Sequence, residues 1–364
     1  MNYKYIHLLY GHDTKFSKSL IALINDKRND FVTSDHLFVT PFQNVYEELK
    51  DFGNIILDCS KKNLYRKYYK QCLLIISHGG EKTLRLLLTP KKIKKKIVYR
   101  YWGGSRISHL DCKIGNVFKR FKNYCLIFLF RKIYEPFWAI GVGTIVDIID
   151  LSKNLRIKKY YFLRYNSNDN YDMLNSAKRE FGNQIQKNSN TLNVLLGHRG
   201  TLENNHIKIL QTIVKYGNSI HIFIPLSYGD KEYIESVKRF VKTIPNQNIT
   251  IVDSFLNYQD YSKLLSKMDI GLFDGNTSYA LGNITAMIFL RKTLFLNPTG
   301  VIAKAMDLDN APYKDINKIG DFEYFKELIT YPENFKSKLE TAPIDENVRL
   351  WNEMFEDLNN YDKN

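Results

Sequence analysis

The chain has 364 residues, 44% hydrophobic and 14% aromatic, which excludes general disorder and predicts two domains rather than one hydrophobic core. Its net charge of +15 is unevenly distributed: residues 1–165 hold 31 Lys and Arg against 13 Asp and Glu, whereas residues 166–364 hold 22 against 25. A polyanionic partner is therefore expected for the first half, whether nucleic acid, anionic lipid or a phosphorylated substrate.

The first half, residues 1–165, alternates short apolar runs with helical segments. Strands are predicted at Tyr3–Tyr10, His36–Thr40, Asn54–Leu57, Cys72–Ser77, Ile97–Tyr101 and Phe137–Val142. Helices are predicted at Thr14–Lys27, Glu81–Leu88 and Ile114–Lys132. Residues 166–190 are rich in Asn, Ser and Lys and are interpreted as an interdomain connection with one helical piece, Tyr171–Phe181.

The second domain, residues 191–344, shows a regular βαβα pattern. Its predicted strands are Thr191–Gly197, Ser219–Ile224, Asn248–Val252, Asp269–Phe273 and Thr293–Asn297. Its predicted helices are Asn205–Tyr216, Lys231–Val241, Tyr258–Lys267 and Leu281–Leu290, and residues 345–364 add a C-terminal helix. The alternation predicts an α/β fold of two Rossmann-like domains with an intervening cleft, in which ligands bind at the carboxyl ends of parallel strands.

Three polar loops follow strands of the second domain and are candidates for binding a nucleotide sugar. Glycines permit close backbone approach, and the helices that follow offer amide groups to phosphates. The candidate residues are Gly197, Arg199, Gly200, Asn204, His206, Pro225, Ser227, Tyr228, Ser278, Gly282 and Asn283. Ordinary strand–helix loops with polar caps remain the alternative.

Ionisable groups follow two strands of the first half. Asp13 comes after the first strand, beside His12, and His78 comes after the strand Cys72–Ser77. Either group is a candidate catalytic base for an acceptor hydroxyl, Asp13 ahead of His78. A capping Asp and a hydrogen-bonded core His are the structural alternatives.

A dense basic segment mixes cations with aromatic residues between positions 85 and 132, where Asp111 is the only acidic residue. The candidates for holding an acceptor phosphate or an anionic membrane are Lys91, Lys92, Lys94, Lys95, Lys96, Arg100, Arg106, Lys119 and Arg120. The interleaved aromatic residues are Phe118, Phe121, Tyr124, Phe128 and Phe130, a mixture typical of interfacial helices. The alternative is a solvated face above a core helix. Because the segment carries no nucleic-acid-binding motif, no nucleic-acid partner is expected.

Neither a cofactor nor a bound metal is expected. The pair Asp307 and Asp309 resembles a metal-binding DxD but follows the last clear strand, and the four cysteines lack metal-ligand spacing. The apolar run at the N-terminus is interrupted by His7, so no signal peptide is expected, and Tyr124–Phe130, the longest apolar run, is too short to span a bilayer. A cytoplasmic chain is predicted.

Three blocks of the second half resemble the TDP-N-acetylfucosamine:lipid II N-acetylfucosaminyltransferases. The blocks are Leu195-Leu196-Gly197-His198-Arg199-Gly200 with Asn204 and His206; Ile224-Pro225-Leu226-Ser227-Tyr228-Gly229 with Tyr233; and Asp269-Ile270-Gly271 running to Gly282. Weaker echoes in the first half are Gly11 with Asp13, His78-Gly79 and Trp102-Gly103-Gly104. Where the family carries acidic residues, this chain has Ser105 and Thr201, which leaves a different donor sugar open.

The resemblance implies a GT-B glycosyltransferase without an essential metal, peripheral on the cytoplasmic face of the bacterial inner membrane. By it, the second half binds a nucleotide-diphosphate sugar, with TDP as the nucleotide and N-acetylfucosamine as the sugar. The basic first half takes an undecaprenyl-diphosphate-linked glycan of a surface polysaccharide pathway. Two alternatives stay open: a sugar-nucleotide epimerase of the same fold, and a nonenzymatic protein whose basic half binds nucleic acid or membrane.

Overall fold

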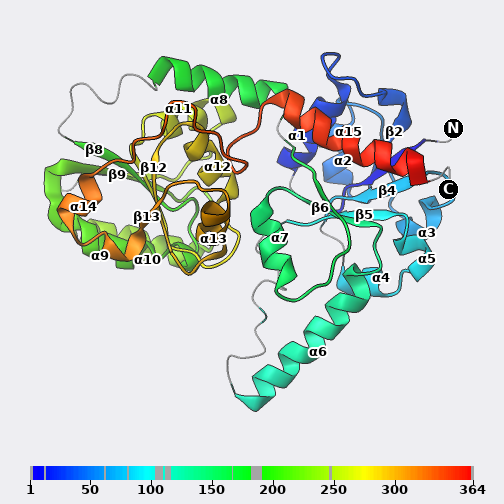
Figure 1. Cartoon of the computed structure of the whole chain (residues 1–364), viewed down its shortest axis with the longest axis horizontal. Coiled ribbons are helices and arrows are strands. Elements are labelled where there is room, and N and C mark those ends of the chain that lie inside the picture. The colour runs from blue at the N-terminus through cyan, green and yellow to red at the C-terminus, as the bar shows by residue number, and fades with distance from the viewer. Residues whose placement is uncertain are drawn as a thin grey trace. The chain divides into compact units, whose positions relative to one another are not determined.

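The structure is a computed structural model that describes residues 3–11, 14–60, 63–79, 82–102, 110, 116–165, 167–181, 191–245 and 248–361. The chain divides into two compact units (Figure 1). Unit 1 comprises Met1–Asn168 and Ala342–Asn364, and unit 2 comprises Asp169–Thr341. In the described part of the chain, no helix combines the length and the apolar character that crossing a membrane requires.

Unit 1 is built on a seven-stranded sheet in the order β3-β2-β1-β4-β5-β6-β7, with every neighbouring pair parallel. The strands are β1 (Tyr5–Leu8), β2 (His36–Thr40), β3 (Ile55–Leu57), β4 (Leu74–Ser77), β5 (Ile97–Arg100), β6 (Ala139–Val142) and β7 (Tyr160–Phe162). The helices are α1 (Thr14–Asn25), α2 (Gln43–Leu49), α3 (Leu64–Tyr68), α4 (Thr83–Leu87), α5 (Lys91–Lys94), α6 (Val117–Tyr134), α7 (Ile145–Ser152) and, from the C-terminus, α15 (Ile344–Tyr361).

Continuous apolar runs explain the strands of unit 1, because helices cover both faces of a parallel sheet. β1, β2, β4 and β6 are buried along their whole length. Two hydrophobic clusters result, one on each face. The second cluster includes four side chains of α15, namely Trp351, Met354, Phe355 and Leu358. The C-terminal helix therefore completes the core of unit 1.

Unit 2 carries a six-stranded parallel sheet in the order β10-β9-β8-β11-β12-β13. The strands are β8 (Leu192–Leu196), β9 (Ile220–Pro225), β10 (Ile249–Val252), β11 (Ile270–Phe273), β12 (Thr293–Leu296) and β13 (Lys314–Asp315). The helices are α8 (Asn168–Phe181), α9 (His206–Ile213), α10 (Lys231–Lys242), α11 (Tyr258–Ser266), α12 (Leu281–Phe289), α13 (Val301–Leu308) and α14 (Phe322–Lys326). The predicted doubly wound α/β architecture is confirmed for both units.

Elements missed by the sequence patterns are short or lie inside other apolar runs. β7 and β13 have three and two residues, too few to show a period. α7 follows β6 after only two residues, so the apolar residues of the strand and of the helix form one continuous run in the sequence. Its start is nevertheless encoded, since Thr144 and Asp147 form a capping box at its N-terminus.

Candidate functional site

Two loops at the carboxyl edge of the unit 2 sheet are joined by backbone hydrogen bonds. Gly200, in the loop after β8, donates its N–H to Tyr228 O (2.9 Å) and accepts from Asp230 N (2.8 Å), in the loop after β9. A Cβ at Gly229, where φ is +137°, would lie 2.2 Å from Gly200 O. The glycines expected to let a ligand approach thus also let the two loops approach each other, which fixes their relative position.

Two predicted ligand contacts, Asn204 and His206, are buried inside the first loop. The Asn204 amide donates to Arg199 O and to Thr201 Oγ1, both at 3.0 Å, and its oxygen lies 3.0 Å from His198 Nδ1. Burial lowers the pKa of His198 and of His206 to about 4, so both rings are neutral at neutral pH. These residues shape the loop that presents Arg199, whose buried Nε has no hydrogen-bond partner among the described residues.

Asp274, absent from the predicted set, connects three segments of this edge. It directly follows β11 and is 6% exposed. Its carboxylate accepts hydrogen bonds from Asn205 Nδ2 (2.9 Å) and Asn297 Nδ2 (3.2 Å), and Lys208 Nζ lies 3.3 Å away. The sequence signal was an acidic residue at a strand's carboxyl end, which points equally to a ligand contact and to a loop brace.

α12 begins at this edge, at Ala280, without a side-chain cap. α9 and α13 also lack a cap from their own N-cap residues, but their first amides are bonded, His206 N to Tyr233 Oη (3.1 Å) and Val301 N to Asn276 O (3.3 Å). α10 differs, because the Asp230 carboxylate accepts from its first turn. A Cβ added at Gly282, in the first turn of α12, would meet nothing within 4 Å. Uncapped helical amides next to open space form the arrangement that binds phosphate.

The other predicted donor residues lie around the same edge. Gly197, with φ +69°, starts the first loop, and Pro225 ends β9 inside the sheet. Ser227 is half-buried and Tyr228 is 50% exposed. Ser278 is buried, and Asn283 donates to Tyr261 Oη at 2.7 Å.

Unit 1 has a cavity of about 280 Å³ at the carboxyl edge of its own sheet. Its walls come from the ends of strands and from α1: Leu9, Gly11, Phe16, Ser17, Leu20, His78, Trp102 and Tyr165. We call this the unit 1 pocket. His78 is buried there, with Nε2 2.9 Å from His7 Nδ1 and Nδ1 bonded to Tyr165 Oη. His12 and Asp13, the latter the other candidate base, lie outside the described residues.

A buried ion pair supports the floor of this pocket. The Arg100 guanidinium lies 4.6 Å from the Trp102 ring centroid and 5.3 Å from that of Tyr165. Its partner is Asp147, 4.0 Å away, whose pKa burial raises and which accepts from Gly143 N at 2.7 Å.

The basic segment divides between surface and interior. Lys91, Lys92, Lys95, Lys119 and Arg120 are exposed and Lys96 is half-buried, whereas Arg106 lies outside the described residues. Arg100 and Lys94, both predicted to hold an acceptor phosphate or an anionic membrane, are instead buried, with 5% and 3% of their surface exposed. Arg100 is the last residue of β5 and its side chain is directed into unit 1. Lys94 Nζ donates a hydrogen bond to Lys132 O, near the end of α6, at 3.1 Å.

α6 projects from the rest of unit 1 (Figure 1). Phe118, Phe121, Tyr124 and Phe128 are 87%, 69%, 67% and 63% exposed, at helical spacing. We call these four residues the α6 aromatic face. The opposite side of the helix, including Ile127, is buried in unit 1.

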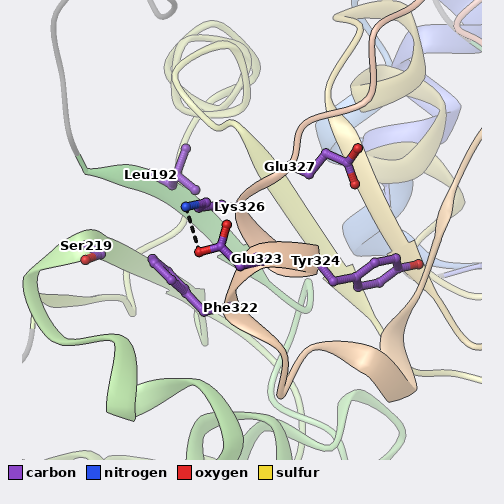
Figure 2. Close-up of a pocket in the computed structure, with 7 residues that line it drawn as sticks. All are labelled: Leu192, Ser219, Phe322, Glu323, Tyr324, Lys326 and Glu327. Atoms are coloured by element: carbon purple, nitrogen blue, oxygen red, sulfur yellow. Dashed lines mark ion pairs between the residues drawn. The ribbon is translucent and has the colours of Figure 1, made fainter.

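A larger cavity, about 880 Å³, lies at the other end of the unit 2 sheet (Figure 2). It is lined by Leu192 at the start of β8, Ser219 just before β9, and residues of α14. Figure 2 shows the Lys326–Glu323 ion pair on its wall, 2.8 Å in length. Because ligands of parallel α/β sheets bind at the carboxyl ends of strands, this cavity is not the candidate site.

The described residues contain no cluster of three or more His, Cys, Asp or Glu side chains placed to hold a metal ion. Asp309, from the DxD-like pair, accepts from Ser337 Oγ.

Residues 152–314 match the family of 4-alpha-L-fucosyltransferases, glycosyl transferase group 56. The match covers every unit 2 loop described above. A glycosyltransferase from Rickettsia africae has a similar structure, with a TM-score of 0.58, 13% identity, and 86% of this chain and 84% of that chain covered. Anabaena HepE in complex with UDP gives a TM-score of 0.56 at 10% identity, covering 83% and 82%. UDP-GlcNAc 2-epimerase from Neisseria meningitidis bound to UDP-GlcNAc gives 0.52 at 14%, covering 98% and 99%.

At these identities the solved structures show the fold, which is that of GT-B enzymes. The family match adds the type of reaction, which is glycosyl transfer. The resemblance to the group 56 fucosyltransferases is confirmed over residues 152–314, and the chain is a glycosyltransferase with the GT-B fold.

Proposed function

We propose that this enzyme transfers a deoxyamino sugar such as N-acetylfucosamine from TDP to an undecaprenyl-diphosphate-linked glycan. Transfer would take place at the anionic cytoplasmic surface of the bacterial inner membrane, in the synthesis of a surface polysaccharide. The observation that carries the donor assignment is the uncapped start of α12 beside the open space over Gly282.

The donor diphosphate fits the carboxyl edge of unit 2 for electrostatic reasons. A helix N-terminus carries about half a positive charge, and α12 and α13 both begin there without an acidic or hydroxyl cap. Gly300 lies against the α12 loop, since its Cβ would be 2.7 Å from Gly275 O, so the two helix starts are held together. Arg199 adds a cation in the neighbouring loop. These groups would stabilise the charge that develops on the departing nucleotide diphosphate.

The nucleotide is inferred from the sequence resemblance and from a structural neighbour. The three sequence blocks that resemble the TDP-N-acetylfucosamine transferases favour TDP, and the structurally similar Anabaena protein was solved with UDP, so a pyrimidine nucleotide is common to both. Tyr228, half exposed at the same edge, provides a ring for stacking against a base.

The acceptor is assigned to unit 1 on different grounds. The unit 1 pocket brings a histidine, a tyrosine and a tryptophan to the carboxyl edge of the sheet, which suits a sugar hydroxyl that must lose a proton. The α6 aromatic face, with Lys119 and Arg120 beside it, has the composition of an interfacial helix, and each cation near an anionic surface contributes about 1 kcal/mol. The enzyme would bind its lipid-linked acceptor at that membrane surface.

Calorimetric titration of the protein with TDP, UDP, GDP and CDP tests the donor assignment. We expect TDP to bind most tightly, and binding of Gly282→Leu to be at least tenfold weaker because the new side chain fills the space over α12. The substitution removes no contact and replaces a helical glycine, so stability should not fall. Gly320→Leu is the matched control, since a Cβ there makes only an ordinary 3.6 Å contact with Thr212. Equal TDP affinity in both variants would place the donor elsewhere.

A further inference from the structure

Three histidines form a continuous hydrogen-bonded row through the core of unit 1. His7 lies on β1, His36 begins β2, and His78 directly follows β4. His78 Nε2 is 2.9 Å from His7 Nδ1, and His7 Nε2 is 2.9 Å from His36 Nδ1. The row ends at Tyr165, whose hydroxyl is bonded to His78 Nδ1. We call these four side chains the histidine row.

The connectivity makes the row directional. A neutral imidazole donates from one ring nitrogen and accepts at the other, so hydrogen bonds in a chain of neutral imidazoles must all run the same way. Burial lowers the pKa of His36 to about 4 and of His78 to about 3, and keeps that of His7 well below 6.5. A proton accepted at one end of such a chain releases another at the opposite end and inverts every tautomer between them.

The two ends of the row lie in different surroundings. At one end, Tyr165 and His78 line the unit 1 pocket, and Trp102 Nε1 donates to His78 O at 2.9 Å. At the other end, His36 follows Asp35, whose carboxylate is 21% exposed and pairs with Lys4 Nζ at 2.7 Å. The row therefore runs from the pocket to His36, whose neighbour in sequence, Asp35, has a partly solvent-exposed carboxylate.

The charged groups near the row are few in the described structure. Arg100, held by Asp147, approaches Tyr165 and also disfavours a positive charge on His78. Asp35 and Lys4 act on His36 with opposite sign. The side chains that α15 packs against the row are aromatic: the rings of Trp351 and His7 are 6.4 Å apart, and those of Phe355 and His36 are 5.4 Å apart.

We propose that the histidine row is the proton acceptor of the transfer reaction and relays the acceptor's proton from the unit 1 pocket to His36, at the far end of the row. The proposal rests on the proposed function, because it requires a hydroxyl acceptor in that pocket. As the acceptor oxygen forms its bond to the sugar and the bond to the nucleotide diphosphate breaks, the hydroxyl proton passes to Tyr165 Oη. The Tyr165 proton moves to His78 Nδ1, the His78 proton moves from Nε2 to His7 Nδ1, and the His7 proton moves from Nε2 to His36 Nδ1. His36 is left as an imidazolium, adjacent in sequence to Asp35, and later gives up its extra proton to solvent, while the electron pair of the broken bond stays on the nucleotide diphosphate.

Tyr165 and His78 line the pocket and are the catalytic residues of this relay, whereas His7 and His36 act through them. His7→Asn tests the relay, because an amide keeps polar contacts but does not pass a proton by changing tautomer. We expect kcat at pH 7 to fall about a hundredfold, the scale of a lost general base, with TDP affinity unchanged. The variant's kcat should then rise tenfold per pH unit as hydroxide replaces the relay, whereas the wild-type profile stays flat over the same range.

A second readout separates relay from packing. In mixtures of H2O and D2O, wild-type kcat should depend on deuterium fraction with the curvature of several protons in flight, and the variant should give a straight line. His36→Phe should show the same two changes, because it removes the far end of the row among aromatic neighbours. His221→Asn is the control: this histidine bonds Thr250 Oγ1 at 2.8 Å in unit 2 and should retain wild-type kcat and curvature.

The outcomes distinguish the relay from its alternatives. If His7→Asn lowers thermal stability but keeps the wild-type pH profile and curvature, the row is a core hydrogen-bond chain and the relay is overturned. If Asp13→Asn abolishes turnover while both row variants keep theirs, the acceptor proton goes to Asp13. If the wild-type enzyme binds no nucleotide diphosphate, the proposed function fails before the relay is reached.

Discussion

The carboxyl edges of the two sheets carry different kinds of side chains. In unit 2 the loops are polar, tied together by the Gly200–Gly229 bridge and by Asp274, and they surround the uncapped start of α12. In unit 1 the edge is aromatic, with a pocket formed around His78, Trp102 and Tyr165. Both sheets have the same parallel architecture.

The difference agrees with the two ligands proposed for the two units. A diphosphate is already charged, so its site needs fixed dipoles that are held open in advance. A sugar hydroxyl is neutral and must lose a proton, so its site needs an acceptor with a route for that proton. Unit 2 provides rigid amides, and unit 1 provides imidazoles in contact with one another.

The largest expected effect tests whether the unit 1 imidazoles are neutral in the folded state. Burial holds the pKa of His36 near 4 and of His78 near 3, and that of His7 well below 6.5, while in the unfolded chain each lies near 6.5. Only the unfolded state then binds protons between these values, so stability is full above pH 6.5 and falls as the pH drops towards 4. For three histidines the loss is about 4 kcal/mol per pH unit.

Urea unfolding followed by tryptophan fluorescence measures this loss, because Trp102, Trp138 and Trp351 are the chain's three tryptophans and all belong to unit 1. His36→Phe should reduce the pH slope by about one third. A transition midpoint that stays constant from pH 7 to pH 5 would contradict buried, neutral imidazoles in unit 1.

The next effect concerns the ion pair beneath the unit 1 pocket. Asp147→Leu removes the partner of Arg100, and both side chains are almost inaccessible to solvent. A buried charge left unpaired costs about 3–5 kcal/mol, so unit 1 should unfold at much lower urea concentration. Arg100→Met combined with Asp147→Leu should recover most of the loss. Glu235→Gln, which disturbs an exposed pair with Lys238, should change the midpoint little, and an equally small effect of Asp147→Leu would refute the pairing.

A somewhat smaller effect is expected at the corresponding brace of unit 2. Asp274→Leu leaves the amides of Asn205 and Asn297 without their acceptor and removes one of the links between the α12 and α13 loops. We expect a loss of about 2–3 kcal/mol in stability and at least a tenfold loss in TDP affinity, measured by chemical unfolding and calorimetry. Asp253→Asn, on the exposed end of a pair with Lys238, is the control. Unchanged affinity in Asp274→Leu would mean that the donor does not depend on this brace.

Substitutions on the α6 aromatic face are expected to affect folding least. They should act specifically on binding to membranes. Phe118→Ser with Phe121→Ser should leave stability unchanged, since both rings are largely exposed. Affinity for vesicles containing phosphatidylglycerol should fall about tenfold or more, measured by sedimentation. Phe255→Ser, a ring 69% exposed in unit 2, should leave vesicle binding intact. Tighter binding of RNA than of vesicles at matched salt would favour the nucleic-acid alternative for unit 1.

Much of unit 2 could be predicted because its strands are apolar runs separated by polar loops of regular length. The loops after β8, β9 and β11 were found by their position alone. The role of Asn204 could not be predicted, because an amide after a glycine pair is equally suited to hold a ligand or to hold its own loop. Only the contacts of Asn204 with Arg199 O and Thr201 Oγ1 distinguish the two uses.

In unit 1 the prediction for the basic segment was partly wrong for a related reason, because sequence alone does not show which way a side chain faces. Charge counting places every Lys and Arg on a surface, but Arg100 occupies an inward position of β5 and finds Asp147 47 residues later in the chain. The histidine row was likewise invisible, since His7, His36 and His78 lie far apart in sequence and meet only through strand pairing.

The sequence by itself determined what depends on local order: the α/β alternation, the polar loops at strand ends, the charge imbalance and the resemblance to a transferase family. The tertiary structure decided which of those residues face one another. Strand order brought β1, β2 and β4 side by side and so aligned three imidazoles, and the return of α15 to unit 1 buried them beneath Trp351 and Phe355. Such contacts join residues separated by tens to hundreds of positions, and local patterns carry no information about them because side-chain periodicity fixes a face of an element but not the neighbour that the face meets.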